Sequence, residues 1–147
     1  GETEKILGGL GFKKDDYNQM TNTFSGGWRM RIELAKLLLQ KHDILLLDEP
    51  FISLDYPTAQ SLRNDFMKFY KKYKPIVIFI THDLREAISL SQRIIFLDSK
   101  PMKIVLDYEN KKDFSLNLES LEIEEIKEKL LSTYPSILSG NIKDCLF

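Results

Sequence analysis

The chain has 147 residues, and its 21 Lys and Arg against 22 Asp and Glu give a formal net charge of −1 at pH 7. This near-neutral charge provides no electrostatic footprint for wrapping nucleic acid. Hydrophobic residues make up 43% and charged residues 29%, which is typical of a globular domain with one core and argues against a multidomain enzyme.

The chain shows no sign of secretion or membrane insertion. No apolar run approaches the roughly 18 residues that span a bilayer, and the N-terminal sequence has no apolar signal segment. The single cysteine, Cys145, cannot build an internal disulfide or a cysteine-based metal site. We therefore expect a reducing, cytoplasmic location.

The first third of the chain predicts two helices. A short amphipathic piece at residues 2–7 is followed by a glycine cluster at 8–11, which we expect to break the helix. Residues 28–40 carry apolar side chains at helical spacing, and additional leucines widen the stripe, so this helix is predicted to be mostly buried. The stripe consists of Trp28, Ile32, Ala35 and Leu39.

The middle of the chain predicts a strand, a helix and a second strand. Residues 44–47 are continuously apolar, as in a strand covered on both faces of a parallel sheet. Pro57 suits the first turn of a helix over 56–73, with Asp55 as its cap. Residues 76–80 are β-branched and apolar, and they predict the next strand.

The last part predicts a helix over 84–90, strands over 93–97 and 102–106, a turn at 99–101 and a loop over 107–118. Ile123, Ile126 and Leu130 then form the apolar stripe of a final helix, whose glutamates precede its lysines as the helix dipole favours. The alternation of strands and helices predicts an α/β fold with parallel strands.

Three features of this scaffold could carry chemistry, and the first is Phe24-Ser25-Gly26-Gly27-Trp28, immediately before a helix. Two glycines allow close approach of a ligand to the backbone, and a helix N-terminus offers N–H groups and a positive dipole end to a phosphate. Ser25 adds a hydroxyl. The alternative is a plain helix cap.

The second feature is Asp48-Glu49, at the carboxyl end of the first strand. Ligands of open α/β sheets bind outside the carboxyl ends of the strands. Asp48 suits a Mg²⁺ ligand, and Glu49 suits a group that orients or deprotonates water. The alternatives are two solvated charges at a strand end, or an unrelated fold that binds a metal alone.

The third feature is His82, which directly follows the strand ending at Ile80-Thr81. It belongs to the same sheet edge as Asp48 if the strands are parallel. There its imidazole could bond a transferring phosphoryl oxygen or hold the attacking water. The alternative is a structural histidine, and we interpret His42 as a surface residue.

Together these features resemble the ATP-binding-cassette (ABC) ATPases, specifically the C-terminal part of their nucleotide-binding domain, over roughly residues 1–108. The segment 24–28 resembles the family's signature motif, with Trp28 where glutamine is commonest. The segment 44–49 resembles the Walker B strand, with Glu49 at the position of the catalytic glutamate. Ser53-Leu54-Asp55 resembles the D-loop, and His82 the switch histidine.

Two subfamilies are represented. Residues 4–50, including Trp28-Arg29-Met30-Arg31, resemble the ABC-F proteins, soluble ATPases that act on ribosomes. After Pro50, Phe51 and the segment 81–87 resemble the ATPase subunits of nitrate, sulfonate and taurine importers. The sequence therefore reads like a join of two subfamilies near residue 50.

The resemblance implies a set of roles in a complete P-loop NTPase-like domain that uses ATP and Mg²⁺. Asp48 would hold Mg²⁺ through water, and the catalytic residues would be Glu49, which polarises the attacking water, and His82, which steadies the γ-phosphate. Asp55 would couple the two sites of a dimer, and the segment 25–28 would clamp the nucleotide of a second domain. That segment is Ser25, Gly26, Gly27 and Trp28.

No Gly-x-x-x-x-Gly-Lys-Ser/Thr motif occurs in the sequence, and the glycine cluster at 8–11 has neither its spacing nor its lysine. Because phosphoryl transfer depends on positioning and charge stabilisation by that cradle, we expect the chain to be inactive alone. The expected partners are the N-terminal half of the domain, a second nucleotide-binding domain, a transmembrane permease subunit, or the ribosome if the chain is ABC-F. As part of an importer it would be peripheral at the inner face of a membrane.

We expect three segments: a helical signature subdomain at 1–43, an α/β core at 44–108 from Walker B to the switch histidine, and a C-terminal loop and helix at 109–147. The leading hypothesis is a fragment of a transporter-associated ABC ATPase. Two alternatives stay open: an ABC-F fragment, and a non-catalytic module that docks on an intact ABC ATPase through the signature face or the Ile123/Ile126/Leu130 stripe.

Overall fold

The computed structural model describes residues 1–40, 42–52, 54–98, 102–111, 113–114, 117–135 and 137–138. Ser53, the predicted turn at 99–101 and Cys145 lie outside the described residues. The chain divides into two compact units, Gly1–Ile80 and Thr81–Phe147, and each is described by itself.

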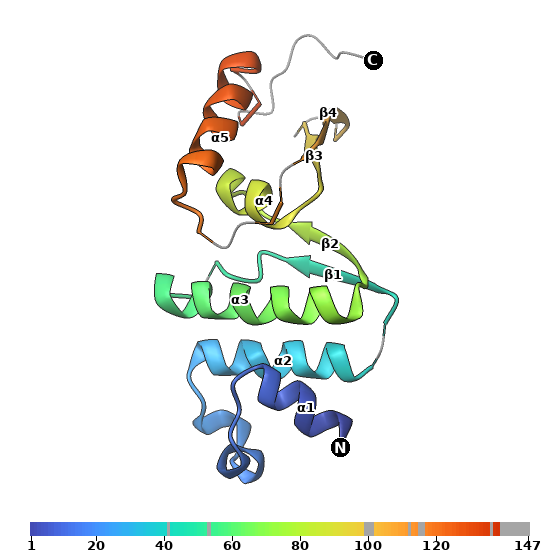
Figure 1. Cartoon of the computed structure of the whole chain (residues 1–147), viewed down its shortest axis with the longest axis vertical. Coiled ribbons are helices and arrows are strands. Elements are labelled where there is room, and N and C mark those ends of the chain that lie inside the picture. The colour runs from blue at the N-terminus through green and yellow to red at the C-terminus, as the bar shows by residue number, and fades with distance from the viewer. Residues whose placement is uncertain are drawn as a thin grey trace. The chain divides into compact units, whose positions relative to one another are not determined.

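The first unit is a three-helix layer beside a pair of strands (Figure 1). Its elements in chain order are α1 (Glu2–Gly9), two short 3₁₀ helices η1 (Lys14–Asn18) and η2 (Thr21–Thr23), α2 (Gly26–Leu39), β1 (Ile44–Asp48), α3 (Tyr56–Tyr73) and β2 (Ile76–Ile80). α1, α2 and α3 pack against one another.

β1 and β2 pair in parallel, with Ile44 opposite Ile76 and Asp48 opposite Ile80, and α3 forms the crossover between them. This confirms the predicted parallel strands. The strand β2 and the helix α3 begin and end where the sequence predicts. Asp55 caps α3 as predicted, because its carboxylate accepts a hydrogen bond from the Thr58 N–H at 3.1 Å.

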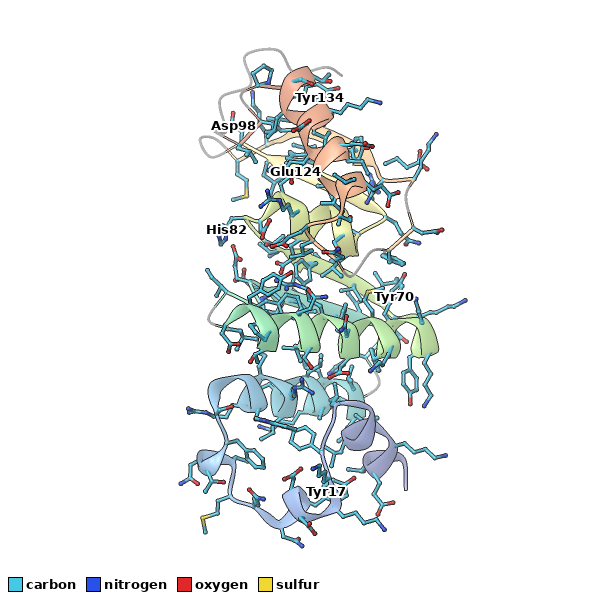
Figure 2. All side chains as sticks on the ribbon, turned by 60° about the vertical axis from the view of Figure 1, so that its left-hand side comes forward. Tyr17, Tyr70, His82, Asp98, Glu124 and Tyr134 are labelled. Carbon is cyan, nitrogen blue, oxygen red and sulfur yellow. The ribbon has the colours of Figure 1, made fainter. Side chains whose placement is uncertain are left out.

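The strand pair buries only one face within the described chain, which differs from the prediction for residues 44–47. Leu45 and Leu47 are buried, whereas Ile44 and Leu46 are 57% and 63% exposed, and Ile78 on β2 is 52% exposed. The reason is that α3 lies along one side of the strands in both views and no other described element of this unit covers the other side (Figures 1 and 2).

Two details of the helices differ from expectation. α1 continues through Gly8 and Gly9, and the chain turns only at Gly11, which has a φ of +86°. On α2, Leu39 is 36% exposed while Arg31 is buried, so the buried face is shifted from the predicted stripe. The shift follows from Arg31, whose side chain finds polar partners on α3 and in the Leu10 carbonyl just after α1.

The second unit contains α4 (Leu84–Leu90), β3 (Arg93–Leu97), β4 (Ile104–Glu109) and α5 (Leu121–Thr133). Its core is formed by side chains of all four elements: Leu84, Ile88, Ile94, Ile123 and Leu130, with Phe96, Leu106 and Ile126 packed against them. The predicted stripe on α5 therefore packs inside this unit, which removes it as a docking surface.

β3 and β4 are antiparallel, and β4 is displaced from the predicted strand at 102–106. Asp107 and Tyr108, which we predicted to lie in a loop, pair with Ile95 and Ile94. This long-range pairing extends the strand to Glu109, and the Asp107 carboxylate also accepts a hydrogen bond from Arg93 Nε at 2.8 Å.

Candidate functional site

Asp48 and Glu49 lie at the carboxyl end of the β1–β2 pair, as predicted. Asp48 ends β1, is exposed and stands opposite Ile80, the last residue of β2. The Glu49 N–H donates to the Ile80 carbonyl at 2.9 Å, and the Glu49 carbonyl accepts from the Ile52 N–H at 3.2 Å. The two carboxylates are therefore delivered to one edge by a turn that is tied to both strands.

Glu49 also has a left-handed backbone conformation, with a φ of +45°. For a residue with a Cβ this conformation costs roughly 1–2 kcal/mol, and such residues concentrate at functional sites. No sequence pattern indicates this conformation. This backbone conformation sets the direction in which the chain leaves β1. It also sets the direction of the Cα–Cβ bond of Glu49.

Phe51 anchors the residues that follow Glu49. It is buried, its ring lies 5.7 Å from that of Phe79 on β2, and the Arg63 guanidinium of α3 sits 4.9 Å from its ring centre. The ring contact with Arg63 is a cation–π interaction. In the sequence Phe51 only distinguished subfamilies, but in the structure it holds the Glu49 turn against the core.

Ser25 begins α2 but does not cap it in the usual way. Its backbone is extended, its carbonyl accepts from the Arg29 N–H at 2.9 Å, and its side chain makes no capping hydrogen bond. By contrast, α3, α4 and α5 are each capped by a side chain, from Asp55, Asp83 and Ser120. Since Ser25 and Gly26 are exposed, the hydroxyl and the first N–H groups of α2 present the chemistry that a phosphate requires.

Trp28 packs into an aromatic cluster with Phe12 and Phe24. Its ring centre lies 4.9 Å from that of Phe12 and 6.1 Å from that of Phe24, while the Arg31 guanidinium lies 5.0 Å from the Trp28 ring. The cluster fastens the 3₁₀ segment to α2. Trp28, which we predicted as a nucleotide contact, is half-buried and thus has a packing role beside any contact it makes.

Arg31 is a central residue that the sequence reasoning missed. It is 9% exposed, and its Nη1 donates to the Leu10 carbonyl at 2.6 Å and to Asp65 at 2.7 Å, while its Nη2 donates to Ser61 at 2.6 Å. It thereby joins α2 to α3 and to the chain that follows α1. Arg31 lies at helical spacing from Gly27, Leu34 and Leu38, which are buried on α2. This spacing is the sequence pattern that could have indicated its burial.

An open hollow of about 250 Å³ lies between the first turns of α2 and α3, lined by Ser25, Gly27, Trp28, Arg31, Pro57, Thr58 and Ser61. Asp55 stands at the start of α3 beside it, and the hydrogen bond from Thr58 lowers the pKa of its carboxyl. Leu54 of the predicted D-loop lies close to Gly27 of the predicted signature segment, since a Cβ added to Gly27 would be 3.8 Å from Leu54 Cδ2.

His82 belongs to the second unit and is exposed (Figure 2). It precedes the capped start of α4, where Asp83 accepts from the Arg85 N–H at 2.9 Å. On its other side the Thr81 hydroxyl donates to Glu86 at 2.9 Å. His82 therefore sits on a short segment held at both ends, two residues after the end of β2.

Among the described residues, no three His, Cys, Asp or Glu side chains are grouped to hold a metal ion. Mg²⁺ bound to nucleotides commonly uses one or two carboxylates together with phosphate oxygens and water. The single exposed carboxylate of Asp48 fits that donor set. Within the same described residues, no helix is both long and apolar enough to cross a membrane.

Comparisons with known proteins agree with the resemblance. The family model described as "ABC transporter" matches residues 1–52. An aliphatic sulfonates import ATP-binding protein, SsuB, from Bacillus cereus is 39% identical over 110 residues, covering 75% of this chain and 44% of that protein. An uncharacterised ABC transporter ATP-binding protein from Methanocaldococcus jannaschii is 35% identical over 132 residues, covering 87% and 46%.

Protein GCN20 from Saccharomyces cerevisiae is 39% identical over 109 residues, covering 74% of this chain and 13% of that protein. The chain spans less than half the length of these curated relatives. The match, the relatives and the parallel strands with flanking helices support an ABC ATPase domain with a P-loop NTPase-like fold. The chain resembles both the sulfonate importers and the ABC-F proteins, as the sequence predicted.

Proposed function

We propose that these residues form the C-terminal half of the ATP-binding domain of a transporter-associated ABC ATPase. The observation that carries the proposal is the pair of carboxylates at the end of β1, where Glu49 is held in a left-handed turn by the last carbonyl of β2. A fixed carboxylate next to a candidate Mg²⁺ ligand is what the hydrolysis of a nucleoside triphosphate requires.

In the complete domain, Asp48, Glu49, His82 and Asp55 each have a separate role in binding or hydrolysing ATP. Asp48 would hold Mg²⁺ through water, and Glu49 would accept a hydrogen bond from the attacking water and polarise it. His82 donates to a γ-phosphate oxygen, and Asp55 couples the two sites of a dimer. Mg²⁺, when bound, neutralises charge on the phosphates.

Ser25, Gly26 and Gly27 act on a nucleotide held by another domain, with Trp28 bracing the turn. The support is the exposed Ser25 hydroxyl, which no helix cap uses. The β- and γ-phosphates themselves must be cradled by residues outside these 147, since no Walker A motif occurs among them. The segment boundaries predicted from the sequence, 1–43, 44–108 and 109–147, remain part of this proposal.

Two partners are proposed in order of support. A permease subunit at the cytoplasmic face of a membrane is placed first because Phe51 and the segment 81–87 resemble the importer ATPase subunits and because the sulfonate-import relative matches 75% of the chain. The ribosome is the second candidate, since residues 4–50 resemble the ABC-F proteins. Co-sedimentation with ribosomes, tested against co-purification with permease subunits, separates the two.

The test uses an intact ABC ATPase whose own signature serine is replaced by arginine, so that it binds Mg-ATP but hydrolyses it slowly. Adding the 147-residue chain should raise phosphate release in proportion to its concentration. Ser25→Arg should abolish this effect. Glu49→Gln is the matched control and should retain the effect, because the partner supplies its own glutamate. Equal stimulation by the Ser25→Arg chain would overturn the proposed role of the signature turn.

A further inference from the structure

The two glycines of the Ser25-Gly26-Gly27 turn have different surroundings. A Cβ added to Gly26 would meet nothing within 4 Å, whereas a Cβ added to Gly27 would lie 2.3 Å from Thr58 Cγ2 and 3.8 Å from Leu54 Cδ2. Real carbon atoms do not approach so closely. Gly27 is therefore required by the contact between α2 and α3, and Gly26 is not.

The same end of α3 is tied down by other contacts. The Thr58 N–H donates to Asp55 at 3.1 Å, which fixes the first turn of α3. One turn further along both helices, Arg31 Nη2 donates to Ser61 at 2.6 Å and Arg31 Nη1 to Asp65 at 2.7 Å. α2 and α3 therefore lie side by side from their first turns onward (Figure 1).

We propose that Thr58 is a positioning residue for the signature turn. The Thr58 methyl group packs directly on Gly27, in the space that a side chain at residue 27 would occupy. This contact sets the distance between the Ser25–Gly27 turn and the Leu54–Asp55 turn. The two turns then form one rigid element. That Thr58 positions the turn does not depend on the proposed function. Only the role of the positioned Ser25, which is to contact a nucleotide, rests on it.

The contact explains why a small change at Gly27 cannot be absorbed locally. Thr58 is β-branched and has one rotatable side-chain bond, so its restricted rotamers leave the methyl group little freedom to move aside. Arg31 holds the next turn of α2 against α3. A methyl group at residue 27 must therefore push the start of α2 away from α3, and Ser25 moves with it.

The first arm of the test measures the stability of the chain without any nucleotide. Gly27→Ala should lower the unfolding temperature of the first unit by about 5 °C or more, as overpacked contacts do. Gly27→Ala combined with Thr58→Ala should recover most of that loss, because the added Cβ then meets the Cβ of residue 58 at 3.7 Å and Leu54 Cδ2 at 3.8 Å, which are ordinary van der Waals distances. Gly26→Ala is the matched control and should lower the temperature by no more than about 1–2 °C.

Amide hydrogen exchange locates the effect. Gly27→Ala should speed exchange in residues 24–31 and 54–61 together, and the double variant should restore protection in both segments. Failure of Thr58→Ala to recover the loss, or faster exchange in the 24–31 segment alone, would overturn the proposal that Thr58 positions this turn.

The second arm asks whether position matters for function, using phosphate release by the signature-defective ABC ATPase. A displacement of about 1 Å can cost up to a hundredfold in rate, so Gly27→Ala should reduce the stimulation at least about tenfold. Thr58→Ala in the same chain should return it to within about threefold of wild type. Recovery of stability without recovery of stimulation would overturn the positioning role.

Absence of stimulation by the wild-type chain would refute the proposed function. The stability and exchange measurements of the first arm would still decide whether Thr58 sets the position of the turn.

Discussion

Glu49 combines a candidate catalytic carboxylate with a backbone conformation that an L-residue adopts at a cost, its φ being +45°. The hydrogen bonds to Ile80 and from Ile52 hold it there. Because glycine adopts this conformation without the Cβ penalty, Glu49→Gly should be more stable than Glu49→Ala by roughly 1 kcal/mol in the free energy of unfolding. Urea unfolding measures the difference.

Lys74, the C-cap of α3, provides a matched comparison because its φ is +49° and it belongs to the same unit. Lys74→Gly should likewise be more stable than Lys74→Ala by about the same amount. If alanine and glycine were equally stable at residue 49 but not at residue 74, the left-handed turn at Glu49 would be contradicted.

Arg31 and Asp65 form a buried ion pair, with side chains 11% and 10% exposed. Replacing Arg31 by methionine would leave a buried carboxylate with only the exposed Lys68 ammonium at 3.1 Å, and would orphan the Leu10 carbonyl. Removing one partner of a buried pair costs about 3–5 kcal/mol. Denaturant titration of Arg31→Met should show a loss near the lower end of that range.

Lys68→Met serves as the control, because this ammonium is 73% exposed and exposed pairs contribute roughly 0–1 kcal/mol. A loss for Arg31→Met no larger than that for Lys68→Met would show that Arg31 does not hold the three helices together.

At the scale of elements, α5 is attached to α4 by an ion pair as well as by its apolar stripe. Arg85 Nε donates to Glu124 at 2.8 Å and Lys127 donates to the same carboxylate at 2.7 Å (Glu124 is labelled in Figure 2). These partners lower the pKa of Glu124 from 4.5 to about 2. The pair therefore stabilises the folded unit above the ordinary pKa of a glutamate, and this contribution is lost as pH falls from about 4.5 towards 2.

Hydrogen exchange of α5 at a series of pH values, referred to the intrinsic exchange rates, measures this effect. Protection of residues 121–133 should fall between pH 4.5 and 2 in the wild-type chain, and the Glu124→Gln variant should lack that part of the fall. Raised salt should weaken the wild-type effect, since Arg85 is 45% exposed. Identical pH profiles for the two chains would contradict the assigned pair.

Elements whose signals are local were predictable from the sequence. The β-branched run indicated the extent of β2, and Pro57 with the acidic cap Asp55 indicated where α3 begins. β4 was misplaced because its extent is set by pairing with β3, and Arg31 was missed because its partners are distant in sequence. The two carboxylates at the strand end were predictable, but the left-handed turn that carries Glu49 was not.

At the scale of the whole molecule, the strand pair presents an apolar face that no described element of the first unit covers. Leu46 and Ile76 are each 63% exposed on it, and such faces promote association. Leu46→Lys should therefore reduce self-association in sedimentation velocity without lowering the unfolding temperature. Its neighbour Leu45 is 3% exposed, so Leu45→Lys should unfold the unit. Unchanged association in the Leu46→Lys chain would contradict a role for this face.

The central claim is that these residues carry the water-activating and signature side of an ABC ATPase site while the phosphate cradle lies elsewhere. The most direct test is Mg-ATP binding and phosphate release by the 147-residue chain alone, compared with its Glu49→Gln variant. We expect no saturable binding at millimolar ATP and no phosphate release that depends on Glu49. Micromolar binding, with release abolished by Glu49→Gln, would show that a cradle exists within these residues and would contradict the account.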